Sequence, residues 1–325
     1  MIHRTKPLRK PIILVHGGAG RLRSKQLREY KLCLKDAVEN GFKALVTGSA
    51  IDGVVEAVKT MENCGFMNAG IGSVLNIYRE VEMDAGIMDG STLRVGGVAL
   101  VKRIKNPILL AKMVMEKTDH ILLAGSFAED LGIKLGLETW NFKRHPQYAD
   151  KIRKYNELYS RLLEGKIKHL RRLRKLLEKM NETHFETVGA VALDKEGKLA
   201  AATSTGGYWL KLPGRIGDTP VVGAGFYANH IAAASASGIG EYILITGLCR
   251  RAVELVEGGL SAFEAASKSI AYITNIFGEN TAGLIIVDAH GYVGYAFNTE
   301  GMGRALLSGS HREAKVAVFK YEPLI

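Results

Sequence analysis

Apolar residues along this chain repeat with either a helical or a strand period, and segments of the same kind are grouped together. They repeat at three- and four-residue steps, the period of an amphipathic helix, over residues 25–46, 51–61, 241–257 and 262–277. Residues 187–205 and 281–299 each predict two strands joined by a polar turn, and a looser hairpin is predicted over residues 72–86. Grouped hairpins and helices indicate an α+β protein in which antiparallel sheets are covered by helices.

The net charge of +11 is concentrated in one segment of the chain. Residues 143–179 contain 13 Lys or Arg against 4 Asp or Glu, a local net charge of +9. Leucine and isoleucine recur there at helical steps, which predicts an amphipathic connector with a solvated basic face. A nucleic-acid-binding arm is the alternative, and DNA binding that weakens with salt would reveal it. We expect no nucleic-acid partner.

Membrane association and secretion are not expected from the apolar pattern. No window approaches ~18 uninterrupted apolar residues, and the apolar run at residues 12–15 is too short for a signal peptide. We therefore expect a cytoplasmic protein. The cysteines, Cys33, Cys64 and Cys249, are odd in number and lack CxxC spacing, which predicts buried thiols rather than a disulfide framework or a zinc site.

Two glycine-rich stretches are candidates for a functional role. The sequence HGGAG at residues 16–20 follows a short apolar strand, and such a loop can bring backbone N–H groups to an anion or a catalytic group. A tight turn that His16 orients is the alternative. Residues 61–73 form an irregular stretch in which backbone carbonyls can converge on a hard cation, or an ordinary loop. The HGGAG stretch lacks the GxGxxG and GxxxxGK[ST] patterns of nucleotide binding.

Thr187 opens a predicted strand directly after the basic segment. A threonine hydroxyl is a poor nucleophile unless a base lies beside it, and an N-terminal threonine carries that base as its own α-amino group. This amine titrates near ~7.7–8, which suits a general base at neutral pH. Cleavage after Glu186 would make Thr187 N-terminal. The residues alone equally allow Thr187 to be a β-branched residue that starts a strand.

Several motifs together resemble the plant-type L-asparaginase and isoaspartyl peptidase family of N-terminal nucleophile (Ntn) hydrolases. They occur in that family's order and nearly its spacing, and they are HGGAG, NAGIGSVLN, EVEMDAGIMDG, TVGAVALD, ATSTGG, GRIGDTPVVGAGFYA, SGIGE and FNTEGM. The resemblance covers the chain apart from its first ten residues and the basic segment. It implies an αββα four-layer sandwich that cleaves itself into an α-subunit, residues 1–186 with a basic linker at about 143–186, and a β-subunit, residues 187–325. It also implies a dimer of these cleaved heterodimers.

The resemblance implies a role for each residue that matches a family motif. Thr187 would attack the carbonyl of Glu186 during maturation, and then the side-chain amide of L-asparagine or of a β-aspartyl peptide, through a threonyl acyl-enzyme. The hydroxyl of Thr205 would bond to the nucleophile, and Asn68 would face it. Ser237 stands where the family usually has threonine, as an oxyanion donor beside the N–H of Gly238; the residues alone allow Ser237 to cap the following helix instead.

The resemblance also implies how an α-amino acid is recognised. Arg215 would bind its α-carboxylate, while Asp218 and the carbonyl of Gly240 would hold its α-ammonium group. Without the resemblance, Arg215 and Asp218 could form an ordinary surface pair. A structural sodium ion would be bound by the backbone carbonyls of Met61, Glu62, Cys64, Met67, Ala69 and Ile71, and catalysis needs no cofactor.

One departure from the family's pattern concerns maturation. Glu186 stands where plant-type members usually have glycine, whose freedom tolerates the strained conformation before the acyl shift. Related glycosylasparaginases and threonine aspartases carry aspartate there, so we expect cleavage that is slow but chemically possible. Two other functions stay open at this point. They are a threonine endopeptidase of the threonine-aspartase kind, and an uncleaved, inactive homologue with an interaction role.

Overall fold

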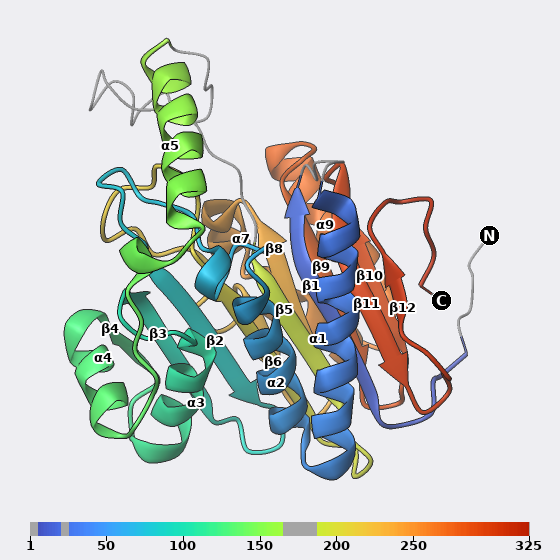
Figure 1. Ribbon diagram of the computed structural model, residues 1–325. Helices are drawn as coiled ribbons and strands as arrows, with labels where there is room; N and C mark the ends of the chain where they lie inside the picture. The colour runs from blue at the N-terminus through green and yellow to red at the C-terminus, as the bar shows by residue number, and fades with distance from the viewer. Residues whose placement is uncertain (1–5, 21–25, 165–186, 325) are drawn as a thin grey trace.

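The computed structural model describes residues 6–20, 26–164 and 187–324, and its strands form two sheets (Figure 1). The larger sheet has the order β12-β11-β1-β5-β6-β2-β3-β4, and the smaller has the order β10-β9-β8-β7. Every pairing is antiparallel except that of β3 with β4. The strands are β1 Ile12–Gly20, β2 Met83–Asp89, β3 Val95–Val101, β4 Leu122–Ala124, β5 Val188–Leu193, β6 Leu199–Thr205, β7 Phe226–Ala228, β8 Ala232–Gly238, β9 Ala282–Asp288, β10 Val293–Phe297, β11 Gly301–Ser308 and β12 Lys315–Ala317.

Helices cover the outer face of each sheet. Helices α1, α2 and α3 pack on the larger sheet, and α8 and α9 pack on the smaller one (Figure 1). The helices are α1 Leu27–Thr47, α2 Ala50–Cys64, α3 Pro107–Lys117, α4 Gly125–Lys134, α5 Tyr148–Leu163, α7 Gly240–Thr246, α8 Leu248–Glu257 and α9 Ala262–Phe277, with 3-10 turns η2 Gly70–Gly72 and η3 Phe142–Arg144. The predicted α+β class and its helix-covered antiparallel sheets are confirmed.

The larger sheet is buried on both faces because side chains alternate along each of its strands. Ile13 and Val15 of β1 belong to the apolar cluster shared with α1 and α2, whereas Ile12 and Leu14 belong to the cluster between the two sheets. A third cluster joins the smaller sheet to α8 and α9. A strand that is buried on both faces needs apolar residues at consecutive positions, as IILV in β1 illustrates.

Three of the four predicted helices are confirmed with small shifts at their ends. Side chains fix the N-terminal ends of two of these helices. Ser49 with Asp52 forms a capping box at α2, and Ser261 with Glu264 forms one at α9. The single helix predicted over residues 241–257 is wrong, since Gly247 has a φ of 55° and divides it into α7 and α8. Apolar periodicity alone does not detect such a break, because the pattern continues through it.

The hairpins at residues 187–205 and 281–299 are confirmed as β5–β6 and β9–β10. The hairpin predicted over residues 72–86 is wrong: those residues hold the end of η2, a loop and the start of β2. Strand β2 pairs instead with β6 and with β3, which begins after the turn at residues 90–94. The apolar alternation of residues 74–77 reflects burial of the loop against the helices rather than a strand.

The expectation of buried thiols is wrong for two of the three cysteines. Cys33 of α1 and Cys64 at the end of α2 form a disulfide, with their Cα atoms 6.1 Å apart. The two helices pack side by side, which brings together residues separated by 31 positions. Cys249 is a buried free thiol, as expected.

The basic segment is described only in its first part. Helix α5 confirms the amphipathic prediction for residues 148–163, and it stands at one end of the layered body (Figure 1). Residues 165–186, including Glu186, lie outside the described residues, as does the rest of the predicted linker helix. No helix in the described ranges is both long and apolar enough to cross a membrane.

Candidate active site

Thr187 lies where the two sheets meet, immediately before β5 of the larger sheet. Its side chain is buried, and its backbone N–H donates to Oγ of Ser237 at 3.2 Å. Ser237 lies on β8 of the smaller sheet and also accepts the N–H of Ala19, near the end of β1, at 3.0 Å. It does not cap the next helix, whose N-cap is Ile239. The prediction that HGGAG forms a loop after a strand is wrong, because these residues continue β1 and pair with β11. The fold therefore brings together Thr187, Ser237 and the HGGAG stretch of β1.

Thr219 is a neighbour of Thr187 that the sequence analysis did not identify. The two side-chain hydroxyl oxygens are 3.4 Å apart, and Thr203 Oγ1 donates to the backbone carbonyl of Thr219 at 2.8 Å. The hydroxyl of Thr205, at the end of β6, accepts the N–H of Gly207 at 3.0 Å. The expected bond from Thr205 to the nucleophile remains a prediction. The available signal was the position of Thr219 directly after Asp218, in the motif GDTP.

Asn68 is fixed beside the end of β6. Its Nδ2 donates to the carbonyl of Gly207 at 2.5 Å, and its Oδ1 accepts the N–H of Val74 at 3.0 Å. The N–H of Gly206 donates to the backbone carbonyl of Asn68 at 2.9 Å. Because β6 pairs with β5 up to Val188, these contacts place Asn68 next to the strand end that carries Thr187.

The residues of the predicted amino-acid clamp come from the loop that holds Arg215 and Asp218 and from Gly240, the first residue of α7. A Cβ atom built on Gly240 would lie 2.6 Å from Nη2 of Arg215 and 2.7 Å from Oδ1 of Asp218, so the three residues are in contact. Arg215 donates through Nε and Nη2 to the carboxylate of Glu241, each at 2.9 Å, and its guanidinium lies 4.4 Å from the ring centroid of Tyr208. This geometry leaves Nη1 and the second Nη2 proton for another carboxylate.

Asp218 is unusual because its carboxylate is buried and partly unpaired. Only 3% of the residue is exposed, and Oδ2 has no hydrogen-bond partner among the described residues. Burial raises the pKa of Asp218 to about 7, although the charge of Arg215 acts in the opposite direction. A surface ion pair is therefore excluded. A cationic ligand group would satisfy this carboxylate.

His16 is neutral and connects the two sheets. Its Nε2 lies 2.8 Å from Oγ of Ser235 on β8, and burial lowers the pKa of His16 to about 3 despite an interaction with the backbone of Thr187. A Cβ on Gly189 would lie 2.1 Å from that serine hydroxyl, so glycine is needed for the sheets to approach here. The side chain of His16 crosses to the opposite sheet, and the expectation that it orients the glycine stretch remains a prediction.

The loop after α2 contains the predicted sodium ligands. Gly65 and Gly70 have φ values of 76° and 51°, and a Cβ on Gly70 would lie 2.4 Å from the carbonyl of Glu62. The carbonyls of Met67 and Ala69 each accept one backbone N–H, which leaves each oxygen a second lone pair. Neutral oxygens in a tight loop suit a hard cation. Across the described ranges, no group of three or more His, Cys, Asp or Glu side chains could hold a metal.

Near the same end of α2 lies a buried carboxylate, that of Glu62, which hydrogen-bonds to β6 and to the start of α3. The side chain of Glu62 accepts hydrogen bonds from Ser204 Oγ at 2.7 Å and from the N–H of Ile108, at the start of α3, at 3.0 Å. Burial raises the pKa of Glu62 to about 7. Glu62 therefore connects the end of α2 to β6, one residue before Thr205.

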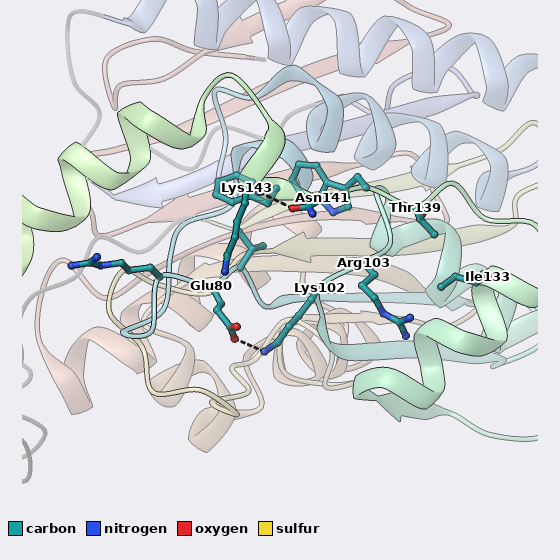
Figure 2. Close-up of a pocket in the computed structure, with 11 residues that line it drawn as sticks. Glu80, Lys102, Arg103, Ile133, Thr139, Asn141 and Lys143 are labelled. Atoms are coloured by element: carbon teal, nitrogen blue, oxygen red, sulfur yellow. Dashed lines mark hydrogen bonds and ion pairs between the residues drawn. The ribbon is translucent and has the colours of Figure 1, made fainter.

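Two cavities differ in their relation to these residues. A cavity of about 350 Å³ has Asn68 in its wall. A larger one, of about 530 Å³, is lined by none of the predicted site residues, and its wall contains an ion pair between Lys102 and Glu80 at 2.6 Å (Figure 2). Thr187, Ser237, Arg215 and Asp218 line neither cavity.

The described contacts define a buried threonine between two sheets, with the hydroxyl of Thr219 beside it. Asp218 directly precedes Thr219 and is in contact with Arg215 and Gly240. A model of the asparaginase family matches residues 9–317. The chain belongs to this asparaginase family.

Individual relatives are similar over nearly their whole lengths. The chain is 46% identical to a plant-type L-asparaginase of Pyrobaculum calidifontis, over 90% of this chain and 95% of the relative. It is 44% identical to a plant-type L-asparaginase of Pyrococcus horikoshii, over 94% and 99%. It is 41% identical to an isoaspartyl peptidase of Escherichia coli, over 91% and 92%.

Proposed function

We propose that this protein is a self-processing amidohydrolase that cleaves the side-chain amide of L-asparagine and of β-aspartyl peptides. Family membership and the names of the similar proteins support the reaction class. The observation that carries the proposal is the position of Thr187, buried at a strand start with its backbone nitrogen 3.2 Å from the hydroxyl of Ser237. The helix–sheet–sheet–helix order supports an αββα sandwich of the Ntn-hydrolase type.

Maturation breaks the peptide bond between Glu186 and Thr187. The hydroxyl of Thr187 attacks the carbonyl carbon of Glu186, the C–N bond breaks, and hydrolysis of the resulting ester releases the upstream carboxylate. The freed nitrogen becomes the α-amino group of the β-subunit, residues 187–325. Ser237 is already placed to hydrogen-bond this nitrogen.

Catalysis then uses the new amine as the base. It removes the proton from the hydroxyl of Thr187 as the oxygen attacks the side-chain carbonyl carbon of the substrate, and it passes that proton to the departing nitrogen. The hydroxyl of Ser237 and the N–H of Gly238 stabilise the oxyanion. Water, deprotonated by the same amine, cleaves the acyl-enzyme and releases aspartate.

The substrate's α-groups are held at the clamp. Arg215 binds the α-carboxylate with the N–H groups that Glu241 leaves free, while Asp218 and the carbonyl of Gly240 bind the α-ammonium group. The side chain of the substrate then points toward Thr187. A peptide attached through the side-chain nitrogen keeps both α-groups, which is why asparagine and β-aspartyl peptides are one substrate class.

Two assembly features belong to the same proposal. The loop carbonyls from Met61 to Ile71 hold a structural sodium ion that takes no part in the chemistry, and the glycine turns that bend this loop support such a site. The cleaved αβ unit forms a dimer.

The buried clamp disfavours a threonine endopeptidase, because a long substrate would not present free α-groups to Arg215 and Asp218.

Intact mass measured over days at several temperatures tests the proposal. Wild-type protein is expected to yield two fragments that meet between Glu186 and Thr187, slowly and faster on warming, because Glu186 replaces glycine. Thr187→Ala should remain one chain, while Thr187→Ser, which keeps a hydroxyl, should still cleave.

The cleaved protein should release ammonia from L-asparagine and hydrolyse a β-aspartyl dipeptide. A wild-type chain that stays whole and hydrolyses neither substrate would contradict the proposal. Cleavage of internal peptide bonds alone would point to the endopeptidase instead.

A further inference from the structure

Lys211 is a lysine whose whole side chain is buried. Its exposed fraction is 0%, and Nζ donates to the backbone carbonyl of Glu82, directly before β2, at 2.8 Å. A buried ammonium group loses its hydration, so it persists only where the fold supplies compensating contacts. The reaction proposed above does not use Lys211, although burying such a group is costly.

The ammonium group of Lys211 packs against the glycine pair, Gly206 and Gly207, that follows β6. A Cβ built on Gly207 would lie 2.8 Å from both Cδ and Nζ of the lysine. Gly207 also has a φ of 77°, which favours glycine at this position. The lysine therefore fills the space beside the glycine pair and holds it in place.

The glycine pair is hydrogen-bonded to two of the predicted catalytic residues. The N–H of Gly207 donates to Thr205 Oγ1 at 3.0 Å, and its carbonyl accepts from Asn68 Nδ2 at 2.5 Å. The N–H of Gly206 donates to the backbone carbonyl of Asn68 at 2.9 Å. A displacement of the glycine pair would therefore move both Thr205 and Asn68.

The register of the larger sheet places Thr205 next to Thr187. Val188 pairs with Ser204, so the same register continued by one residue brings Thr187 opposite Thr205. On its other side, Thr205 pairs with Asp84 of β2. Residues directly opposite each other share a face of the sheet, so these three side chains form a row across three strands. A change at the end of β6 thus alters the surroundings of Thr187.

Asp84, at the end of this row, balances the charge of Lys211. Asp84 is fully buried, and burial raises its pKa while the charge of Lys211 lowers it. Burial lowers the pKa of Lys211, and the charge of Asp84 acts in the opposite direction. Each group therefore favours the ionised form of the other.

Two leucines with left-handed backbone conformations hold these charged residues. Leu100 has a φ of 59°, and its N–H donates to Oδ1 of Asp84 at 2.9 Å. Leu210, directly before Lys211, has a φ of 63°, and its N–H donates to the carbonyl of Leu75 at 2.9 Å. This region is strained for leucine, and such strain persists where surrounding contacts enforce it, most often at functional sites.

We propose that Lys211 is a positioning residue, whose ammonium group fixes the glycine pair that follows Thr205. Through this pair it orients Asn68 and Thr205 around Thr187. The inference rests on the proposed amidohydrolase function. Lys211 itself does not touch the substrate, whose α-groups are held at the clamp.

The first experiment measures kcat and KM for L-asparagine on cleaved Lys211→Met, which keeps an unbranched side chain but lacks the ammonium group. The value of kcat should fall by about ten- to a hundredfold, because a small misplacement of groups around a nucleophile costs this much. KM should stay within about threefold, since Arg215 keeps its bonds to Glu241. Lys112→Met is the matched control: it breaks a partly buried pair with Asp52 and should change neither constant.

A double variant separates positioning from charge balance. Lys211→Met alone leaves Asp84 buried without its compensating charge and should be less stable, whereas Lys211→Met/Asp84→Asn removes both charges and should recover stability. Its kcat per folded and cleaved chain should stay low, with the folded fraction taken from urea unfolding and the cleaved fraction from intact mass. Asp84→Asn alone keeps the amine against Gly207 and should lose much less kcat.

Two outcomes of this comparison would overturn the inference. Wild-type kcat in a double variant of recovered stability would leave charge balance as the role of Lys211. An equally low kcat in Asp84→Asn and in the double variant would assign the effect to Asp84. A double variant that folds but stays uncleaved, while Asp84→Asn cleaves, would support the inference, because Thr187 acts in both reactions.

Gly207→Ala tests the same contact from the other side, since the new methyl group would lie 2.8 Å from Nζ of Lys211. It should lower kcat in the wild-type background and have a smaller effect in the double variant, because residues in contact are energetically coupled. An unchanged kcat in Gly207→Ala, or equal losses in both backgrounds, would overturn the inference. Wild-type protein that hydrolyses no substrate would instead refute the proposed function itself.

Discussion

Asp218 is a buried carboxylate whose charge depends on what is bound beside it. Burial disfavours its ionised form, Arg215 favours it, and the outcome is a pKa of about 7. The ammonium group of an amino acid would act in the same direction as Arg215. If Asp218 binds the ammonium group as we propose, ligand binding and ionisation of Asp218 are coupled at neutral pH.

We predict that binding of L-aspartate, the reaction product, weakens as the pH falls below about 7. Only ionised Asp218 attracts the ligand's ammonium group, so the dissociation constant should rise by up to about tenfold per pH unit below that point. Calorimetry on the cleaved protein measures this without the rate contribution of the Thr187 amine. Asp218→Asn should bind more weakly at pH 7 and show little pH dependence; a slope equal to that of wild type would assign the titration to another group.

Glu241 is expected to orient Arg215 rather than to compete with the substrate. It occupies Nε and Nη2 of the guanidinium and leaves the other donors free. Glu241→Gln should raise KM for L-asparagine by about fivefold and leave kcat within about twofold, since a partly exposed pair contributes only ~0–1 kcal/mol. Steady-state kinetics checks this.

The matched control for Glu241 is Glu254→Gln, which breaks the exposed pair with Arg250 on α8 and should leave both constants unchanged. A lower KM in Glu241→Gln would show that Glu241 competes with the substrate carboxylate.

At the scale of elements, a disulfide joins helices α1 and α2 next to the loop that carries Asn68. The disulfide links residues 31 positions apart, and Cys64 ends α2 three residues before Met67. A cross-link of this loop size stabilises a protein chiefly by restricting its unfolded state. It thus supports both the helix layer and the start of the candidate sodium loop.

We predict that Cys33→Ser/Cys64→Ser lowers the free energy of unfolding by about 3 kcal/mol. Denaturant unfolding of the variant and of wild-type protein, each with and without a reducing agent, measures the effect. The reductant should destabilise wild type and Cys249→Ala equally, since Cys249 is a buried free thiol, but not the double variant. Wild-type stability that does not respond to reduction would contradict the prediction.

For the whole molecule, glycines allow the two sheets to lie as close together as they do. A Cβ on Gly86 of β2 would lie 2.1 Å from Cε1 of Phe226, which is fully buried on β7. Gly189 has the same role beside His16 and Ser235. Because Thr187 lies on one sheet and Ser237 on the other, this spacing also determines whether the site can form.

Gly86→Ala should destabilise the protein by ~1–3 kcal/mol, because the new methyl group forces the sheets apart. It should also lower the extent of self-cleavage at fixed time, since Thr187 and Ser237 separate. Gly258→Ala is the control, because its added Cβ would meet no atom closer than 3.4 Å and its φ is −74°. Urea unfolding and intact mass give the two readouts, and a stable, fully cleaved Gly86→Ala variant would refute the prediction.

The sequence by itself determined most of the helices and hairpins and the class of the protein, but not the break at Gly247 or the loop before β2. The apolar period predicted α1, α2 and α9, because burial of one helix face is a property of a short segment. The motif order identified the family and named Thr187, Asn68, Ser237, Arg215 and Asp218 before any contact was visible.

Only the tertiary structure decided which of these residues meet. The closeness of Thr219 to Thr187, the pairing of Arg215 with Glu241 and the disulfide each join positions from separate segments. The raised pKa of Asp218 also depends on burial by surrounding elements. Such contacts depend on how sheets and helices pack, and packing is a property of the whole chain that local periodicity does not encode.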